Sequence, residues 1–293
     1  MSRTGNLPDD WVKTRKRLQR RNSREKLRAL AKKPLAILAV AVILVLAVAV
    51  GVVAGLKSEG ITGRFCQKTF VPAYFDASVW PQATVGKHQP SAMILNPATG
   101  IGAGSAPNPG YQSAVQQAHA KGIMILGYSS TADGSRPISQ IEADVRNYKA
   151  WYGVNGIFLD SVNGTASELP YYRQLANYIH KTIPGSSVWL NAGVYPDQRY
   201  MSIGDVLMVF EGTYAQYRAV QVPSWAHNYP ATRFANTIYG AVTGAQANSA
   251  ISLSRNRNAG YVFVTNLELP NPYDALPGYW SSEVTAISSG CGT

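Results

Sequence analysis

Two apolar segments of the chain each end in a carboxylate. Residues 156–160 (GIFLD) end at Asp160, and residues 206–211 (VLMVFE) end at Glu211. Continuous apolar runs of this length are typical of strands buried on both faces, as in a parallel sheet covered by helices. Where such strands give way to loops, a carboxylate can keep contact with water and still face a ligand. The two acids therefore indicate a catalytic pair. The alternative is that each acid caps the next helix or turn.

The residues that end the other predicted strands are polar as well. With the two acids they form a set of carboxylates, amides and phenols that contains no Lys, Arg or Cys: Asp76, Asn96, Tyr128, Asp160, Asn191, Glu211, Tyr239 and Asn266. Carboxylates and amides can bracket the hydroxyl groups of a sugar, while aromatic rings cover its apolar face. We therefore predict that the six non-catalytic residues of this set bind a carbohydrate substrate together with Tyr74.

These residues need a scaffold that brings strand ends together. The sequence predicts eight strands, over residues 70–75, 92–96, 123–128, 156–160, 187–191, 206–211, 233–239 and 261–266. Helical patterns lie between several of them, over residues 111–120, 138–151, 168–183 and 244–257. Strands that alternate with helices predict a parallel sheet, and eight such units predict an α/β fold closed into a (β/α)8 TIM-type barrel. An open doubly wound sheet is the alternative.

The N-terminal part of the chain differs in composition from the rest. Residues 1–33 contain twelve Lys or Arg and three acids, which together supply +9 of the net charge of +11. The rest of the chain is nearly neutral, so we expect no nucleic-acid partner for it. Residues 34–56 are uncharged and mostly apolar, and as a helix they would be about 34 Å long, enough to cross a bilayer core of about 30 Å.

A basic flank before an apolar span predicts a cytoplasmic N-terminus. We therefore expect a single-pass protein of the cell membrane, with a cytoplasmic tail (1–33), a transmembrane helix (34–56), a linker (57–68) and an extracellular domain (69–293). The basic tail would face anionic lipid headgroups. A cleaved signal peptide is the alternative, but so long a basic region and so long an apolar stretch are atypical of one.

The two cysteines suit an extracellular domain. Cys66 lies just before the first predicted strand, and Cys291 lies two residues from the end of the sequence. The first and last elements of a closed barrel are neighbours, so we predict a disulfide between them, with two unrelated thiols as the alternative. The four histidines lack ligand spacing, which predicts no metal site. We expect no cofactor, since the glycine-rich residues 100–104 are followed by Pro107 and Pro109, unlike a dinucleotide loop.

Several segments of the outer domain together resemble a known family. They are VPAYFDASVW, MILNPATGIG, PNPGYQSAVQQAHAKGIMILGYSST, GSRPISQIEADVRNYKAWYGVNGIFLDSV and MVFEGTY. This set is similar to the spherulin-4 (spherulation-specific family 4) domain over about residues 69–270. The resemblance implies a (β/α)8 barrel that cleaves an α-1,4-linked, galactosamine-containing polysaccharide outside the cell. The family's acidic residues carry over to Asp160 and Glu211.

The chain departs from the family at one position. Members often have Asp-Glu after the Gly-Ile-Phe strand, whereas this chain has Asp160 and Ser161, so one of three expected acids is absent. From the pair and the resemblance together, we expect Glu211 to act as general acid and Asp160 as nucleophile or charge stabiliser. If the absent Glu takes part in the chemistry, activity is impaired. The chain would then be a surface-tethered carbohydrate-binding module without catalysis.

Overall fold

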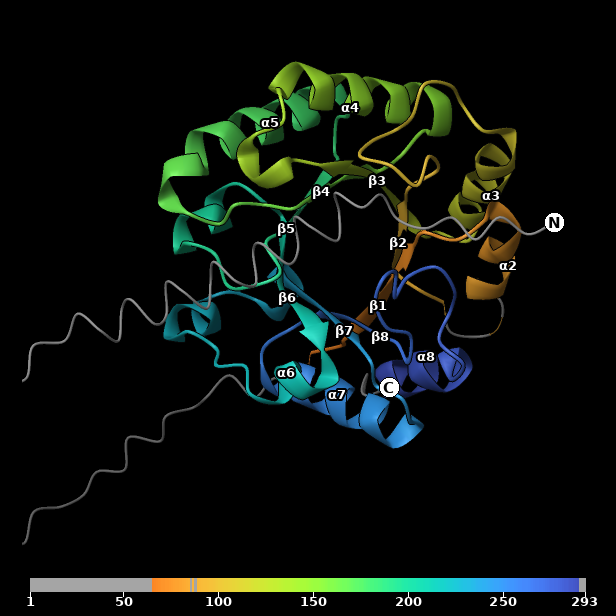
Figure 1. Cartoon of the computed structure of the whole chain (residues 1–293), viewed down its shortest axis with the longest axis vertical. Coiled ribbons are helices and arrows are strands. Elements are labelled where there is room, and N and C mark those ends of the chain that lie inside the picture. Colours follow the sequence, from red (N-terminus) through yellow and green to blue (C-terminus); the bar gives the residue numbers. More distant parts are fainter. Residues whose placement is uncertain (1–64, 85, 87–88, 290–293) are drawn as a thin grey trace, which may run out of the picture.

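The computed structural model describes residues 65–84, 86 and 89–289. Its strands are β1 (Lys68–Ala73), β2 (Ala92–Leu95), β3 (Met124–Ser130), β4 (Gly156–Asp160), β5 (Ser187–Asn191), β6 (Val206–Thr213), β7 (Phe234–Tyr239) and β8 (Tyr261–Val264). They are parallel and follow in chain order around a closed barrel, in which β1 pairs with both β2 and β8 (Figure 1). This confirms the predicted TIM-type barrel and excludes the open doubly wound sheet.

The strands form where the sequence has short apolar runs. All five residues of β4 are buried, and so are the first five residues of β6. Both faces of these strands avoid water, because one face points into the barrel and the other packs against the surrounding helices. Each of the eight predicted strands is present, with its ends within two residues of the predicted ones.

Helices surround the barrel. They are α2 (Trp80–Ala83), α3 (Pro109–His119), α4 (Ile138–Tyr152), α5 (Leu169–Thr182), α6 (Tyr214–Arg218), α7 (Gly244–Asn256) and α8 (Trp280–Ser288). The 3-10 helices are η1 (Ala77–Val79), η2 (Ala132–Gly134), η3 (Ala166–Glu168), η4 (Gln198–Ser202), η5 (Ser224–Asn228) and η6 (Ala231–Arg233). The four predicted helices correspond to α3, α4, α5 and α7, whereas α2, α6 and α8 are too short to show a clear helical period in the sequence.

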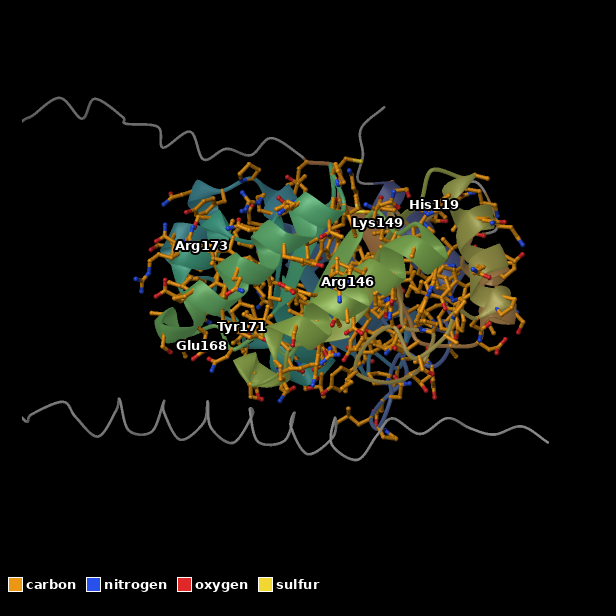
Figure 2. All side chains as sticks on the ribbon, turned by 90° about the horizontal axis from the view of Figure 1, so that it is seen from above. His119, Arg146, Lys149, Glu168, Tyr171 and Arg173 are labelled. Atoms are coloured by element: carbon orange, nitrogen blue, oxygen red, sulfur yellow. The ribbon has the colours of Figure 1, made fainter. Side chains whose placement is uncertain are left out.

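The longer helices are amphipathic. In α5 the side chains of Tyr172, Leu175 and Ile179 are buried, at the spacing that places them on one face of a helix. Charged side chains such as Arg173 of α5 and Arg146 of α4 are exposed on the outer surface of the helices (Figure 2). The helix layer therefore shields the barrel from water and leaves the strand ends as the place for a ligand.

The inside of the barrel is filled by aromatic rings. Phe70 of β1 packs edge-on against Trp189 of β5, with ring centroids 5.4 Å apart, and it also contacts Phe263 of β8 at 6.5 Å. All three side chains are at most 1% exposed. The barrel is thus a packed core and not a channel, as in other TIM-type barrels.

Several predictions fall outside the described residues. The basic tail (1–33), the transmembrane helix (34–56) and Cys291 lie there, so the anchor and the disulfide of Cys66 remain predictions. Within residues 65–84, 86 and 89–289, no helix combines the length and the apolar character that crossing a membrane requires.

Candidate active site

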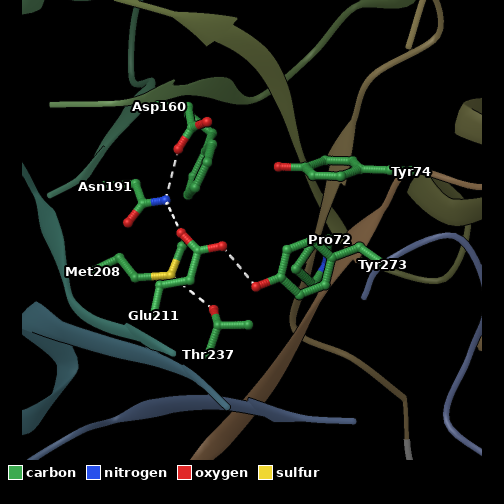
Figure 3. A pocket seen from close by; sticks show the side chains of 9 residues that line it. Pro72, Tyr74, Asp160, Asn191, Met208, Glu211, Thr237 and Tyr273 are labelled. Carbon is green, nitrogen blue, oxygen red and sulfur yellow. Dashed lines mark hydrogen bonds between the residues drawn. The ribbon is translucent and has the colours of Figure 1, made fainter. Parts of the chain in front are cut away.

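A pocket lies at the C-terminal ends of the strands, the end of the barrel where TIM-type proteins bind ligands. Its walls come from β1, β4, β5, β6 and β7 and from the loop after β8 (Figure 3). The residues that line it are Pro72, Tyr74, Phe158, Asp160, Asn191, Met208, Glu211, Thr237 and Tyr273. The structure therefore brings both predicted catalytic acids together with two of the predicted substrate-binding residues, Tyr74 and Asn191.

One side-chain nitrogen joins the two acids. Asn191 Nδ2 donates a hydrogen bond to Asp160 Oδ1 at 2.7 Å and another to Glu211 Oε2 at 2.8 Å (Figure 3). Because both oxygens contact the same nitrogen, they lie at most about 5.5 Å apart, whatever the angle between the two bonds. Like charges this close repel each other, and the shared donor offsets part of the repulsion. The amide of Gly193 in turn holds Asn191, by donating to its Oδ1 at 3.0 Å.

Each acid also accepts a hydrogen bond from a tyrosine. Tyr128 donates to Asp160 Oδ2 at 2.8 Å, and Tyr273 donates to Glu211 Oε1 at 2.7 Å. Burial and then the charge of Asp160 raise the pKa of Tyr128 well above its usual value of 10.0, so its hydroxyl keeps its proton and remains a donor. The result is a continuous hydrogen-bonded chain that runs from Tyr128 to Tyr273 through the two acids and Asn191.

The loop after β3 fixes the backbone around Asp160. Ser161 has a φ of 53°, in the left-handed region that residues with a side chain rarely adopt. Thr131 is fully buried; its amide donates to the carbonyl of Asp160 at 2.9 Å, and its hydroxyl donates to the carbonyl of Ser161 at 2.7 Å. These bonds hold the strained residue in place, and strain of this kind is commonly found beside catalytic groups.

Tyr74 follows β1 and lies across the pocket from Asn191 (Figure 3). Its ring meets the rings of Tyr128 and Tyr273 edge-on, with centroid distances of 5.4 and 5.6 Å. Burial raises the pKa of Tyr74 well above 10.0, and the charges of Asp160 and then Glu211 raise it further. The hydroxyl therefore stays protonated beside the acid pair.

Two predicted binding residues at the ends of β1 and β2 lie outside the pocket. Asp76 is exposed, and its carboxylate accepts a hydrogen bond from the amide of Ser78 at 2.9 Å as the N-cap of η1. Asn96 is 1% exposed, and its Nδ2 makes a long contact of 3.4 Å with the carbonyl of Gly100. Both side chains contact nearby backbone groups in this structure.

The other three predicted binding residues, Tyr239, Asn266 and Tyr128, do not line the pocket either. Tyr239 is 2% exposed at the end of β7 and is not part of the pocket lining. Asn266 accepts a hydrogen bond from the amide of Gly278 at 2.9 Å, which closes the loop after β8. Tyr128 does not line the pocket, but its hydroxyl donates a hydrogen bond to Asp160, which does. Of the predicted binding set, Tyr74, Tyr128 and Asn191 are therefore connected with the acid pair.

The predictions missed five lining residues. Pro72, Phe158, Met208 and Thr237 are strand residues, and Thr237 Oγ1 donates to the sulfur of Met208 at 2.8 Å. Tyr273 comes from the loop after β8. None of the lining residues is Lys, Arg or His, so no basic side chain faces the two acids from the pocket wall. Among the described residues, no group of three or more His, Cys, Asp and Glu is arranged to hold a metal ion.

Comparison with known proteins identifies relatives of the whole domain. The model of the family "Spherulation-specific family 4" matches residues 69–287. Spherulin-4 of Physarum polycephalum is 28% identical over 233 residues, which cover 75% of this chain and 70% of the relative.

Two solved structures resemble the barrel. Sph3 of Aspergillus clavatus, crystallised in complex with GalNAc, aligns with a TM-score of 0.66 and 27% identity, over 76% of this chain and 97% of Sph3. A class V chitinase from Pseudomonas fluorescens Pf-5 aligns with a TM-score of 0.51 over 76% of this chain and 99% of the chitinase, and at 10% identity it shows only a shared fold. The family match over most of the chain leads to one conclusion: the chain belongs to the spherulation-specific family 4.

Proposed function

We propose that this protein is a glycoside hydrolase that cleaves a galactosamine-containing, α-1,4-linked polysaccharide with Asp160 and Glu211. The observation that carries the proposal is the bridge between the two acids, in which one nitrogen of Asn191 contacts both carboxylates at the open end of the barrel. The GalNAc complex of the related Sph3 supports an amino sugar as the substrate. The pocket itself, with carboxylates, an amide and phenols, suits a hydroxyl-rich ligand.

The separation of the acids favours cleavage with retention of configuration. Retaining glycosidases have carboxyl groups about 5 to 5.5 Å apart, whereas inverting enzymes need about 6.5 to 9.5 Å to fit a water molecule. The two oxygens that Asn191 contacts lie within about 5.5 Å of each other, which is compatible with the shorter range. In a retaining mechanism the second carboxylate, here Asp160, attacks the anomeric carbon directly.

In the proposed first step, Asp160 attacks the anomeric carbon while Glu211 transfers its proton to the departing glycosidic oxygen. The hydrogen bonds that Asp160 accepts from Tyr128 and Asn191 stabilise the ionised form that a nucleophile needs. Glu211 accepts an equivalent pair from Tyr273 and Asn191, so the division of roles between the two acids rests on the resemblance to the family. In the second step, Glu211 takes a proton from a water molecule, and the water oxygen displaces Asp160 from the sugar. Both acids then return to their starting states.

Ser161 replaces the third acid of the family pattern, and we propose that activity survives this change. The backbone carbonyl of Ser161 accepts hydrogen bonds from the Thr131 hydroxyl and the Asp133 amide, so the strand end keeps a defined geometry. The acid pair and its donors are complete without a carboxylate at this position. A missing acid at position 161 would then alter substrate preference more than the chemical step.

We further propose that residues 34–56 anchor the enzyme in the cell membrane, with the barrel on the outer side and the basic tail near anionic lipid headgroups. The uncharged run and its basic flank support this topology. In that arrangement the substrate is a polysaccharide of the cell surface or its matrix. A protease added to intact cells would remove the barrel, whereas a cytoplasmic barrel would be protected.

A glycan-cleavage assay tests the enzymatic proposal. Purified full-length protein in detergent would be incubated with galactosamine-containing and other α-linked glycans, and new reducing ends would be measured. We expect release by the wild type, a loss of at least about 100-fold for Asp160→Asn and for Glu211→Gln, and an α-anomeric product by NMR. Asp76→Asn is the matched control, because it alters a strand-end acid outside the pocket. Binding without release by the wild type would favour the alternative, a surface-tethered binding module.

A further inference from the structure

Most of the donor groups on the side chains that line the pocket already make hydrogen bonds to other protein groups. Asn191 has two N–H groups, and its nitrogen makes the two bonds to the acids. The hydroxyl groups of Thr237 and Tyr273 are also used, because they donate to Met208 and to Glu211. Tyr74 is different: within the described residues its hydroxyl makes no hydrogen bond to another group.

The position of this hydroxyl points to a ligand. Tyr74 is only 7% exposed, and Figure 3 shows its hydroxyl directed into the space bounded by Asp160 and Glu211. The influence of both acids on its pKa agrees with this closeness. A hydroxyl that faces the pocket and bonds to no other protein group can donate a hydrogen bond to a bound ligand.

The surrounding rings hold Tyr74 in this orientation. Tyr128 and Tyr273 contact its ring edge-on from two directions, and each of them is fixed by its own bond to an acid. The Tyr74 ring thus packs between two tyrosines that serve the acids, while its own hydroxyl remains available. The pocket is therefore preorganised to offer one donor beside two acceptors.

We propose that Tyr74 is a catalytic residue that contacts the substrate by donating a hydrogen bond to an oxygen of the sugar bound between Asp160 and Glu211. This inference rests on the proposed glycosidase function. The carboxylates can accept from hydroxyl or N–H groups of the sugar, but they cannot donate to its oxygens while ionised. The sugar group that meets Tyr74 is accordingly an acceptor, either a hydroxyl oxygen or the carbonyl oxygen of an acetamido group.

The substitution Tyr74→Phe tests the proposal, because it removes one oxygen and keeps both ring contacts. In full-length protein we expect kcat/KM on the galactosamine-containing glycan to fall about 10-fold, the size of one neutral hydrogen bond. We expect the melting temperature to stay the same or rise, and both limbs of the pH–rate profile to stay in place, because a substrate contact does not alter the titration of the acids. Tyr279→Phe is the matched control: its hydroxyl bonds to the carbonyl of Ala241, outside the pocket, and kcat/KM should not change.

Binding adds a second measurement. Glycan affinity would be compared between Asp160→Asn and the double variant Asp160→Asn/Tyr74→Phe, and the double variant should bind about 10-fold more weakly. An active wild type with an unchanged kcat/KM in Tyr74→Phe would overturn the role of Tyr74 and leave the proposed function intact. A wild type that binds but does not cleave would contradict the proposed glycosidase function. The affinity comparison would then still test whether Tyr74 contacts the glycan. A wild type that neither binds nor cleaves would overturn both proposals.

Discussion

The hydroxyl of Tyr273 donates a hydrogen bond of 2.7 Å to Oε1 of Glu211, across 62 residues of sequence. Tyr273 comes from the loop between β8 and α8, whereas Glu211 lies in β6. The bond therefore makes the last loop of the barrel part of the candidate site. It also completes a symmetric arrangement, since Asp160 receives the equivalent bond from Tyr128. Each acid is oriented by one tyrosine, and Asn191 fixes the two acids relative to each other.

The first prediction concerns Tyr273 as a positioning residue. Tyr273→Phe keeps the ring that contacts Tyr74 and removes the hydroxyl that orients Glu211. We expect kcat to fall about 10-fold with little change in KM, because the substrate keeps its contacts while the acid loses its orientation. Steady-state kinetics on the galactosamine-containing glycan would separate the two constants. A rise in KM at constant kcat would contradict a positioning role and indicate a direct contact with the sugar.

The second prediction concerns the bridge formed by Asn191. Asn191→Ala removes the shared donor and leaves two acids close together without it. We expect a loss of about 10² to 10³ in kcat, comparable to the removal of one preorganised donor in other active sites. The control is Asn96→Ala, which removes another strand-end amide that lies outside the pocket. Equal losses in both variants would show that strand-end amides matter only for folding.

Much of the fold could be predicted because its strands are buried on both sides. Runs such as AMIL in β2 and GIFLD in β4 have no polar face, so they are visible in the sequence without any alignment. The short helices α2 and α6 gave no such signal, since four or five residues do not complete two helical turns. The order of the elements then led to the barrel.

The site was harder to predict than the fold, because the end of a strand does not tell which way a side chain points. In a strand, residues two apart share a face. This rule connects Asp160 with Phe158, which also lines the pocket, and it would have identified that residue. It places Tyr74 with Pro72 in the same way. The rule alone would also select Asp76, two residues after Tyr74, but β1 has ended at Ala73 and the Asp76 side chain caps η1 instead of facing the pocket.

Irregular backbone explains the pocket residues that the two-residue alternation of a strand does not predict. Met208 and Glu211 both line the pocket although they are three residues apart, which a regular strand does not allow. The pairing of β6 with β7 shifts its register between Met208 and Phe210, and such an irregularity turns the following side chains to the other face. Tyr273 lies in a loop without any periodic pattern, so only the three-dimensional structure connects it with Glu211.

The third prediction concerns the two cysteines. β1 pairs with β8 in the barrel, and α8, which ends at Ser288, contacts β1. We expect mass spectrometry of non-reduced peptides to show a Cys66–Cys291 disulfide. Replacing both residues with Ser should lower the free energy of unfolding by up to roughly 4 to 5 kcal/mol in the chain-entropy model. Two titratable thiols in the unfolded, non-reduced protein would contradict the bond.

The last prediction concerns Glu283, an acid of α8 that does not line the pocket and is 1% exposed. Its Oε1 accepts a hydrogen bond from the amide of Val264 at 2.8 Å, whereas its Oε2 has no hydrogen-bond partner among the described residues. Burial raises the pKa of Glu283 well above its usual value of 4.5, and the bond from Val264 offsets only part of this effect. The folded protein therefore retains a proton that the unfolded chain releases.

This difference determines how stability changes with pH. Below pH 4.5 both states hold the proton, so the contribution of Glu283 to stability is fully present there. As the pH rises toward the pKa of the folded state, ionisation of Glu283 lowers the free energy of the unfolded chain, and the contribution to stability is lost. Glu283→Gln cannot ionise and keeps an acceptor for the amide of Val264. In urea unfolding from pH 4 to 8, the free energy of unfolding of the variant should rise relative to that of the wild type by up to about 1.4 kcal/mol per pH unit. A difference that stays constant over this range would mean that Glu283 is ionised in the folded protein.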